Sequence, residues 1–491
     1  MILDSKNISL EDLKTIFHSS APIQLAEECF FNIEGSRAYL DQFSGKNGAP
    51  IYGVNTGFGS LCNTIIEDDD LSTLQKNLLI SHACGMGNEV PTEIVRLMLL
   101  LKVMGLSKGF SGAQRITVET LLDLYNNNMT PIVYEQGSLG ASGDLAPLSH
   151  MCLPLLGLGE VRYQGNVISG IEALEILGRK PIVLKSKEGL ALINGTQFMS
   201  AFAVFNTWKA ESLITHSTNI AAMSLDAYDG RTEPFMDSLH RVRPHQGQLV
   251  IAENMRAALK GSEITLQTKN HVQDPYSFRC IPQVHGASWD TLQYVKQIVE
   301  IEINAVTDNP VVLVDENKVV SGGHFHGQPL SMVMGFLTQA MAEIGSIAER
   351  RTYKLIGGQR NLPAFLTPNP GLNSGFMIVQ YTAASIVSQN KQWCTPAVVD
   401  TIDSSNGQED HVSMGANAAT QLHRVLENVQ KIIALEWLTA AQALDLKRPL
   451  KSSPVVEKYH ELIRKEVPFL PVDDLMSPLM NKAYALLGSL S

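Results

Sequence analysis

Residues 137–144 read Gly137-Ser138-Leu139-Gly140-Ala141-Ser142-Gly143-Asp144, with three glycines in eight positions. Glycine lets the backbone adopt positive φ and approach other groups closely, so this stretch could be a phosphate-binding loop, a nucleophile elbow, a site of backbone chemistry or an ordinary turn. A phosphate-binding loop requires Gly-Lys-Ser/Thr, whereas Asp144 would repel a phosphate. A nucleophile elbow requires a closing glycine where Asp144 stands. Backbone chemistry and an ordinary turn remain.

Backbone chemistry suits the small residues at positions 141–143. Attack by the backbone nitrogen of Gly143 on the carbonyl carbon of Ala141 closes a five-membered ring, provided that no bulky Cβ blocks the approach. Loss of the Ser142 hydroxyl as water then leaves an exocyclic methylidene. That group is a carbon electrophile made without any added cofactor. Composition alone favours an ordinary glycine-rich turn, so the choice depends on the rest of the chain.

The composition indicates a large globular protein with an ample core. The chain has 491 residues, of which 44% are hydrophobic and 18% charged, and its formal net charge is −11. Nucleic acids and anionic membranes bind basic faces, so neither is an expected partner. The apolar stretch Leu97–Leu106 is interrupted by Lys102, which predicts a core helix and not a membrane span.

The chain begins without a basic segment leading into an apolar one, so we expect no signal peptide. Its six cysteines include no Cys-x-x-Cys pair. Unpaired thiols in a reducing cytoplasm are therefore expected. The His324-Phe325-His326 pair has no third ligand nearby in the sequence, so we predict no metal site.

Three further stretches carry candidate functional groups. Glycines hold Tyr52 on an irregular loop in Ile51–Gly59, where a side chain can face a cleft or simply pack in a turn. Asn194 lies in apolar surroundings, so its amide needs a partner, either a backbone carbonyl or a ligand. In Gln273–Cys280, Asp274 and Pro275 predict a helix start that places Tyr276 and Arg279 on one face, with Gln273 beside them. Such an arginine suits either a carboxylate ligand or a structural ion pair.

The C-terminal half predicts long helices. One runs from about Met332 to Ile356, with Phe336 on its apolar stripe and Gly357-Gly358 as its stop. Another runs from about Thr420 to Leu446. Helices of this length need neighbours of similar length, so we expect an antiparallel bundle. We therefore divide the chain into an N-terminal region, residues 1–205, and a bundle region, residues 206–491.

These motifs, from Tyr52 to about Leu446, resemble the aromatic amino acid ammonia-lyase and aminomutase family. The resemblance implies a mainly α fold: an elongated antiparallel long-helix bundle of the fumarase/aspartase-like type, with a smaller N-terminal α+β region carrying the prosthetic loop. It implies that Ala141-Ser142-Gly143 forms 4-methylidene-imidazol-5-one (MIO), with no external cofactor. It also implies homotetramers whose sites draw residues from three subunits.

The resemblance also assigns roles to individual residues. Tyr52 is the implied catalytic base, Arg279 binds the substrate carboxylate, and Phe325 forms an aromatic wall. Asn194, Gln273 and Tyr276 orient the substrate and the ring. Ser81-His82, Met377 and Glu409 match the histidine-acting members of the family.

The implied reaction is elimination of ammonia from L-histidine to give trans-urocanate. Tyrosine or phenylalanine ammonia-lyases and aminomutases remain alternatives, because they share the octet and some carry Ser-His at the positions of Ser81 and His82. A catalytically inactive scaffold relative is a remote alternative. It is disfavoured by the presence of Tyr52, Ser142 and Arg279. The sequence departs from the commonest family form at His324, where asparagine is usual, and this leaves the role of His324 open.

Overall fold

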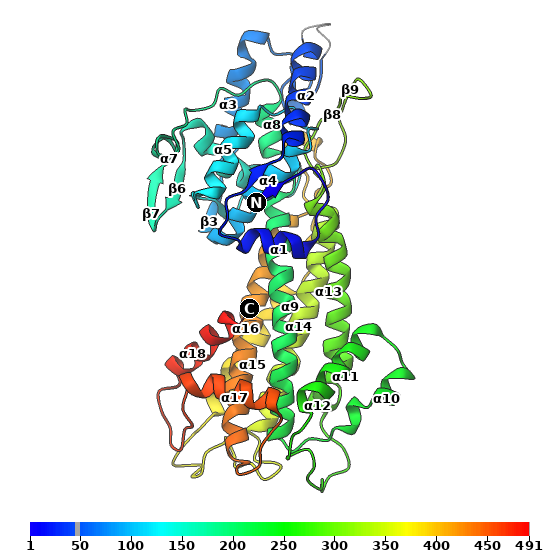
Figure 1. The fold of residues 1–491 in the computed structure, drawn as a ribbon, viewed down its shortest axis with the longest axis vertical. Coiled ribbons are helices and arrows are strands. Elements are labelled where there is room, and N and C mark those ends of the chain that lie inside the picture. The colour runs from blue at the N-terminus through cyan, green and yellow to red at the C-terminus, as the bar shows by residue number, and fades with distance from the viewer. Residues whose placement is uncertain (45–49, 491) are drawn as a thin grey trace. The chain divides into compact units, whose positions relative to one another are not determined.

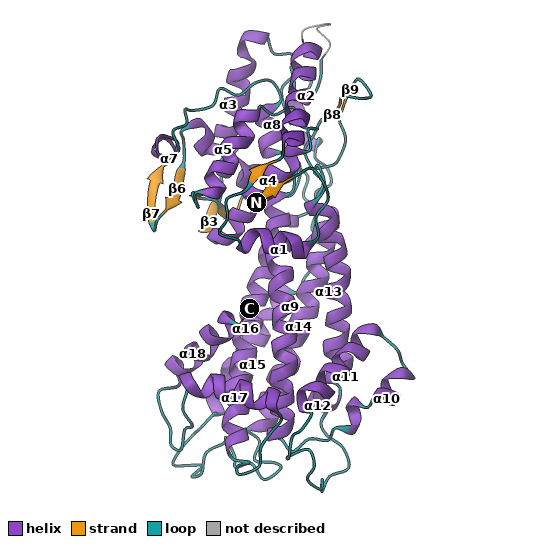
Figure 2. Ribbon diagram, in the orientation of Figure 1, coloured by secondary structure: helices purple, strands orange, loops and turns teal. Residues whose placement is uncertain are grey.

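The computed structural model describes residues 1–44 and 50–490, and these are mainly helical (Figures 1 and 2). They form two compact units. The first comprises Met1–Phe205, Lys296–Met334 and Pro396–Thr420, and the second Asn206–Val295, Gly335–Thr395 and Gln421–Ser491. The sequence predicts one region for all residues after 205. Two later segments instead belong to the first unit, because three long helices cross the division and the loops next to their ends lie in the first unit. These helices are α13 (Ile281–Ile303), α14 (Gln328–Leu355) and α16 (Gly415–Asp445).

The first unit combines short helices with small sheets. Its helices are α1 (Leu10–His18), α2 (Glu27–Ser44), α3 (Leu71–His82), α4 (Thr92–Ser107), α5 (Arg115–Asn126), α6 (Leu145–Cys152), α7 (Gly170–Ile176) and α8 (Glu188–Ile193). Its strands are β1 (Ile2–Leu3), β2 (Gln24–Leu25), β3 (Met86–Glu89), β4 (Thr130–Pro131), β5 (Tyr134–Gln136), β6 (Glu160–Tyr163), β7 (Asn166–Ser169), β8 (Val311–Leu313) and β9 (Lys318–Val320). The sheets have the strand orders β1-β2, β3-β5, β4-β6-β7 and β8-β9. All pairings are antiparallel except β1 with β2.

Helices α3, α6 and α8 pack on one another, and this arrangement positions the candidate residues of the first unit. Helix α3 ends at His82, α6 begins directly after the glycine-rich octet, and α8 ends just before Asn194. Helix α4 is buried along most of its length, as its apolar sequence predicts. Three segments far apart in the sequence therefore present their ends together.

The second unit contains the long-helix bundle (Figure 1). The long helices that have residues in both units are α9 (Gln197–Ala227), α13 (Ile281–Ile303), α14 (Gln328–Leu355) and α16 (Gly415–Asp445). They are joined by α10 (Asp237–Arg241), α11 (Gln246–Leu259), α12 (Tyr276–Arg279), α15 (Met377–Trp393), α17 (Pro454–Glu466) and α18 (Met476–Ser489). Within the described residues, α14 alone is long and apolar enough to cross a membrane by length and composition. Over its 18-residue apolar window it is 56% buried, as core helices are.

Side-chain contacts fix the directions of the bundle helices. Gln380 of α15 donates to Glu349 of α14 at 2.6 Å, whereas Asn390, further along α15, lies beside the earlier Gly345. Helices α14 and α15 are therefore antiparallel, as predicted. Arg351 of α14 forms a fully buried ion pair with Glu436 of α16. A buried pair of this kind constrains helix register, because breaking it strands a charge in the core.

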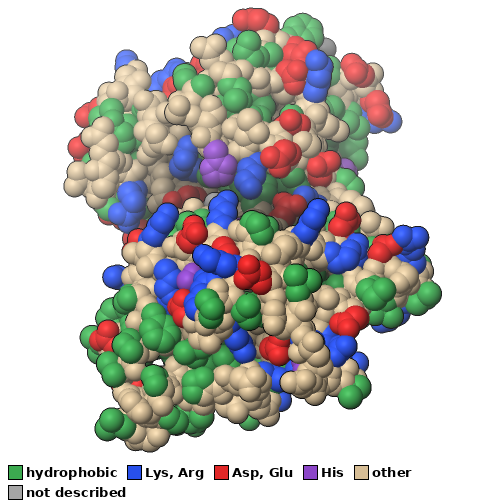
Figure 3. All heavy atoms as spheres, turned by 60° about the horizontal axis from the view of Figure 1, so that its bottom comes forward, with side chains coloured by type: hydrophobic (Ala, Val, Ile, Leu, Met, Phe, Trp, Pro, Cys, Tyr) green, Lys and Arg blue, Asp and Glu red, His purple; other side chains and the backbone are tan. Residues whose placement is uncertain are grey.

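The surface carries both signs of charge. On the face shown in Figure 3, acidic and basic side chains are interspersed, and neither sign forms a continuous patch. All six cysteines are unpaired thiols, and all of them lie in the described part of the chain.

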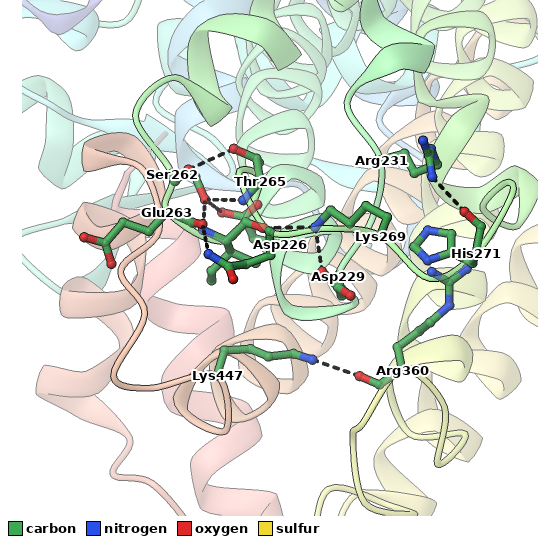
Figure 4. A network of polar contacts seen from close by, with 12 residues as sticks. Asp226, Asp229, Arg231, Ser262, Glu263, Thr265, Lys269, His271, Arg360 and Lys447 are labelled. Carbon is green, nitrogen blue, oxygen red and sulfur yellow. Dashed lines mark hydrogen bonds and ion pairs between the residues drawn. The ribbon is translucent and has the colours of Figure 1, made fainter.

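A buried carboxyl in the bundle, Asp226, makes a pH-dependent contribution to stability (Figure 4). It is 1% exposed and accepts hydrogen bonds from the hydroxyls of Ser262 and Ser452. Burial raises its pKa from 3.8 to about 6, although both hydroxyls and the charge of Lys269 oppose the shift. Because the folded pKa lies above the unfolded one, this stability is fully present below pH 3.8 and is lost as the pH rises through 6.

We expect Asp226→Asn to remove that loss. The shift of about two pKa units corresponds to roughly 3 kcal/mol. Between pH 4 and 8 the wild-type protein should therefore lose about 3 kcal/mol more of its free energy of unfolding than the variant does. Denaturant titrations at both pH values measure the difference. Asp229→Asn, which alters a carboxylate paired with Lys269 at 2.5 Å, is the control and should keep the wild-type dependence. An unchanged pH dependence in Asp226→Asn would contradict this account.

Candidate functional site

The glycine-rich octet lies against the residues that follow α8. Gly143 has φ +78° and pairs with Gly195 in an isolated parallel bridge. The backbone N–H of Asp144 donates to the carbonyl oxygen of Gly195 at 2.8 Å. A Cβ at position 143 would lie 2.2 Å from that same oxygen. Only glycine fits this close approach, so the residue that must react in a ring closure is also the one that the packing requires to be glycine.

Ser142 is held from two sides. Its hydroxyl donates to Oε1 of Glu409 at 2.6 Å, across 267 residues of sequence. Its carbonyl oxygen accepts a hydrogen bond from Nδ2 of Asn194 at 2.9 Å. The other carboxylate oxygen of Glu409 accepts the Ser404 hydroxyl at 2.9 Å. The serine that would lose its hydroxyl thus has a fixed partner for that hydroxyl and another for its carbonyl.

Of the two kinds of partner considered for the Asn194 amide, a backbone carbonyl or a ligand, the structure contains a backbone carbonyl, which belongs to the octet. Asn194 is 2% exposed, and its Oδ1 atom has no hydrogen-bond partner among the described residues. A buried acceptor without a partner costs about 1–3 kcal/mol. An incoming donor, such as a substrate amine, would relieve that cost.

Tyr52 lines a cavity that Ser142, Asn194 and Glu409 also line. Its hydroxyl accepts a long hydrogen bond of 3.4 Å from the backbone N–H of Gly59. Burial raises the pKa of Tyr52; the Gly59 bond lowers it, and the nearby charge of Glu409 raises it further. A tyrosinate base needs the opposite shift, because the charged form must be stabilised. In this chain desolvation dominates, and the residues that line the cavity include no lysine or arginine.

His82 is the last residue of α3 and follows Ser81 directly. Its Nδ1 atom lies 3.0 Å from the Ser81 hydroxyl. Burial lowers the pKa of His82 more than the carboxylate of Glu409 raises it. The neutral imidazole is therefore favoured near neutral pH, with ring nitrogens able to donate to or accept from a polar ligand.

These groups surround one cavity of about 580 Å³. Its polar lining is Tyr52, Thr64, Asn77, Ser81, His82, Ser142, Asn194, Ser405 and Glu409. Its apolar lining includes Leu74, Leu78, Leu145, Leu190 and Ile193. A volume of this size with a few converging polar groups is typical of a small-molecule site. Every lining residue belongs to the first compact unit.

Several predicted site residues do not line this cavity. Phe325 is half-buried in a turn of the first unit, and His324 beside it is exposed. The ring of His326 stacks on that of His411 at 5.8 Å, and its Nε2 atom lies 3.2 Å from the His411 carbonyl oxygen. Among the described residues no group of three potential metal ligands occurs. Ala141 adjoins Ser142 but is not among the lining residues.

Gln273, Tyr276, Arg279 and Met377 belong to the second unit and do not line the cavity either. Tyr276 is 71% exposed, and the Arg279 guanidinium lies over its ring, 4.5 Å from the centroid. The predicted common face of these two side chains is thus present. The Nε atom of Arg279 is buried without a hydrogen-bond partner among the described residues, so this guanidinium retains an unused donor.

Asp274 does not cap α12 as predicted. The N-cap position is Pro275, with no side-chain hydrogen bond. The buried Asp274 carboxylate instead accepts the backbone N–H of Arg231 at 2.6 Å and the Arg360 guanidinium at 3.2 Å. Figure 4 shows Arg231 and Arg360 beside His271 in this network. The backbone N–H of Arg231 and the guanidinium of Arg360 thus take the carboxylate that the helix terminus would otherwise bind, and they anchor the segment that carries Tyr276 and Arg279.

Met377 is the first residue of α15. The loop before it is fixed by Asp473, whose carboxylate accepts the backbone N–H groups of Ser374 and Gly375, each at 2.8 Å. Sequence reasoning missed this anchor, because no local pattern links residues nearly a hundred positions apart.

Asp144 is a further residue whose role the sequence did not reveal. It is fully buried, and burial raises its pKa to about 7. Its Oδ2 atom accepts the backbone N–H of Met199 at 2.9 Å. The signal available in the sequence was a single carboxylate directly before the apolar helix Leu145–Cys152.

Comparison with known proteins agrees with this geometry. Residues 8–465 match the family model described as aromatic amino acid lyase. A histidine ammonia-lyase of Caldanaerobacter subterraneus is 45% identical over 491 residues, covering 100% of this chain and 96% of the relative.

Two solved structures are also similar. The histidine ammonia-lyase of Trypanosoma cruzi superposes with a TM-score of 0.91 at 40% identity, over 99% of this chain and 93% of the other. The tyrosine aminomutase of Streptomyces globisporus gives 0.95 at 33% identity, over 100% and 97%. The family match spans most of the chain, and the relatives are similar along its whole length. The chain therefore belongs to the aromatic amino acid lyase family.

Proposed function

We propose that this enzyme eliminates ammonia from L-histidine to give trans-urocanate, as a carbon–nitrogen lyase. The observation that carries the proposal is the placement of Ser142 between Glu409 and Asn194, in a cavity that also holds Tyr52 and His82. Glu409 and His82 supply an anion and a neutral imidazole for a substrate ring that both donates and accepts hydrogen bonds. The 45% identity to a histidine ammonia-lyase along the whole chain supports the same substrate.

The residues fit a prosthetic group made from Ala141-Ser142-Gly143, namely MIO. Gly143 has no Cβ and has no room for one. The carbonyl oxygen that such a ring retains, that of Ser142, already accepts the Asn194 amide. The ring supplies an electrophilic carbon that captures the substrate amine and makes it a better leaving group. No external cofactor is part of this proposal.

The chain's own side chains perform the remaining steps. Tyr52, once ionised, accepts the β-proton of the substrate, and Arg279 binds the carboxylate bidentately. Asn194, Gln273 and Tyr276 orient the substrate, and Phe325 walls the site. Ser81, His82, Met377 and Glu409 contact the imidazole. The unused donor of Arg279 and the unpartnered oxygen of Asn194 support two of these roles.

The substrate is tested by offering L-histidine, L-tyrosine and L-phenylalanine separately and measuring ammonia and the unsaturated acid. We expect both products from histidine alone. Tyrosine is the strongest competitor, because a tyrosine aminomutase is 33% identical over the whole chain. Release of ammonia from tyrosine but not histidine would overturn the proposed substrate, and a β-amino acid product would indicate a mutase. An intact mass equal to that of the unprocessed sequence would indicate an inactive scaffold.

We also propose a cytoplasmic homotetramer whose sites combine residues of different subunits. The six unpaired thiols support the compartment. The exposure of Tyr276, 71%, and of the nearby apolar Val272, 94%, supports burial of this segment by another copy.

Complementation tests the shared site. Ser142→Ala and Arg279→Met subunits should each be inactive alone. In co-expressed mixed oligomers, about a quarter of the sites would receive an intact Ser142 and an intact Arg279 if these come from different subunits. Activity of the mixture against L-histidine measures this recovery, and light scattering measures the oligomer mass. A mixture as inactive as its parents would contradict the shared site.

A further inference from the structure

Lys102 is a buried lysine that the proposed chemistry does not use. It lies in α4 within the apolar stretch Leu97–Leu106 and is 2% exposed. Burying an ammonium is costly unless a partner compensates it. No carboxylate lies within ion-pair distance of Lys102 among the described residues, unlike Lys187, which pairs with Asp308 at 2.7 Å. Lys102 therefore occupies a position where an apolar residue would be the simpler choice.

The partners of Lys102 are backbone carbonyls at the end of α8. Its Nζ atom donates to the carbonyl oxygen of Asn194 at 3.0 Å and to that of Ala191 at 3.2 Å. The last carbonyls of a helix lack intrahelical partners and carry partial negative charge, which a lysine satisfies. Lys102 thus binds the terminus of α8 and the peptide unit that joins Asn194 to Gly195.

That peptide unit connects directly to the prosthetic triplet. On one side, the Asn194 side chain donates to the carbonyl oxygen of Ser142 at 2.9 Å. On the other, Gly195, with φ +127°, accepts the backbone N–H of Asp144 at 2.8 Å. Rotation of the 194–195 peptide would disturb both contacts at once. Lys102 is the side chain that fixes the carbonyl of this peptide.

We propose that Lys102 is a positioning residue for maturation of Ala141-Ser142-Gly143: by holding the 194–195 peptide, it keeps the triplet in the bent conformation from which the ring closes. Closure joins Gly143 N to Ala141 C and releases the Ala141 oxygen as water with the amide hydrogens of Ser142 and Gly143. A second water takes the Ser142 hydroxyl and its Cα hydrogen. Lys102 exchanges no proton in these steps.

Burial lowers the pKa of Lys102 to about 8, which is consistent with a group held for its donors and not for a salt bridge. Even an uncharged amine has two N–H donors, one for each of the two carbonyls. The inference rests on the proposed function, since it assumes that the triplet matures.

The test follows the intact mass of the chain over time after cell-free synthesis. Wild type should become lighter by two waters. Lys102→Met, which keeps the bulk but has no donor, should do so at least about tenfold more slowly, because it loses both hydrogen bonds to the carbonyls of Ala191 and Asn194. The near-ultraviolet absorbance of the conjugated ring provides a second readout. In fully matured protein, kcat for L-histidine should fall more than KM changes, because Asn194 contacts the reacting group.

Lys187→Met is the matched control. It removes a second fully buried lysine, at the opposite end of α8, whose Nζ atom also donates to the Ser111 carbonyl oxygen at 2.8 Å. It should lower the melting temperature at least as much as Lys102→Met, yet mature at the wild-type rate.

The other outcomes would contradict either the positioning role of Lys102 or the proposed prosthetic group. Maturation of Lys102→Met at the wild-type rate with normal kcat, or equal slowing in Lys187→Met, would overturn the positioning role. Insolubility of both Lys102→Met and Lys102→Gln would overturn it too, since the lysine would then support the fold as a whole. Wild type that never becomes lighter would instead refute the proposed prosthetic group.

Discussion

Ser142→Ala should abolish turnover of L-histidine, with a fall in kcat of at least about 1,000-fold. Alanine has no hydroxyl to lose, so no methylidene can form at position 142. The amine would then remain a poor leaving group, because nothing in the cavity offers it a carbon electrophile. Ammonia release measures the activity, and intact mass should show that the species lighter by two waters is absent.

Ser138→Ala is the control for this result. It removes a hydroxyl from the same octet, one that accepts the backbone N–H of Gly140 at 3.0 Å, but it leaves Ala141-Ser142-Gly143 intact. We expect activity within about tenfold of wild type, the effect of one ordinary hydrogen bond. Near-normal turnover by Ser142→Ala would exclude a serine-derived electrophile.

Tyr52→Phe should lower kcat by about 100- to 10,000-fold, the usual contribution of a positioned general base. The substitution removes only a hydroxyl that accepts a long hydrogen bond of 3.4 Å from the backbone N–H of Gly59. Stability should therefore change little, and the melting temperature checks this. Tyr134→Phe is the matched control, since Tyr134 packs edge-on against His150 with ring centroids 5.2 Å apart and does not line the cavity.

The pH profile separates a base from a packing residue. Burial raises the pKa of Tyr52 above its ordinary value of 10. The basic form is therefore the minor species at neutral pH, and kcat/KM of wild type should rise with pH. The residual activity of Tyr52→Phe should lack that rise. A profile that rises identically in both proteins would assign the alkaline limb to another group.

The helices could be predicted from the sequence where local signals act alone. A capping box of Ser9 and Asp12, a local pattern, starts α1, and the predicted apolar stripe and glycine stop give α14 its C-terminal end. Prediction failed where tertiary partners compete with local ones. Asp274 accepts hydrogen bonds from the backbone N–H of Arg231 and from the Arg360 guanidinium, and it leaves the helix start uncapped. The burial of Phe336 was also predicted wrongly, since it lies on the predicted stripe of α14 yet is 43% exposed.

The candidate site shows the same division. The need of Asn194 for a partner followed from its apolar surroundings alone, but the identity of that partner, Ser142, depends on how α8 and α6 pack. The pKa of Tyr52 could not be predicted, because desolvation depends on every segment that surrounds the phenol.

The sequence by itself determined the reactive triplet. Ring closure demands small residues in a fixed order along the chain, and Ala141-Ser142-Gly143 meets that demand locally. The tertiary structure alone decided what holds the triplet. Glu409 reaches the Ser142 hydroxyl across 267 residues, and Lys102 fixes the peptide beneath it across 92. Such contacts depend on the packing of whole helices, and no spacing in the sequence encodes them.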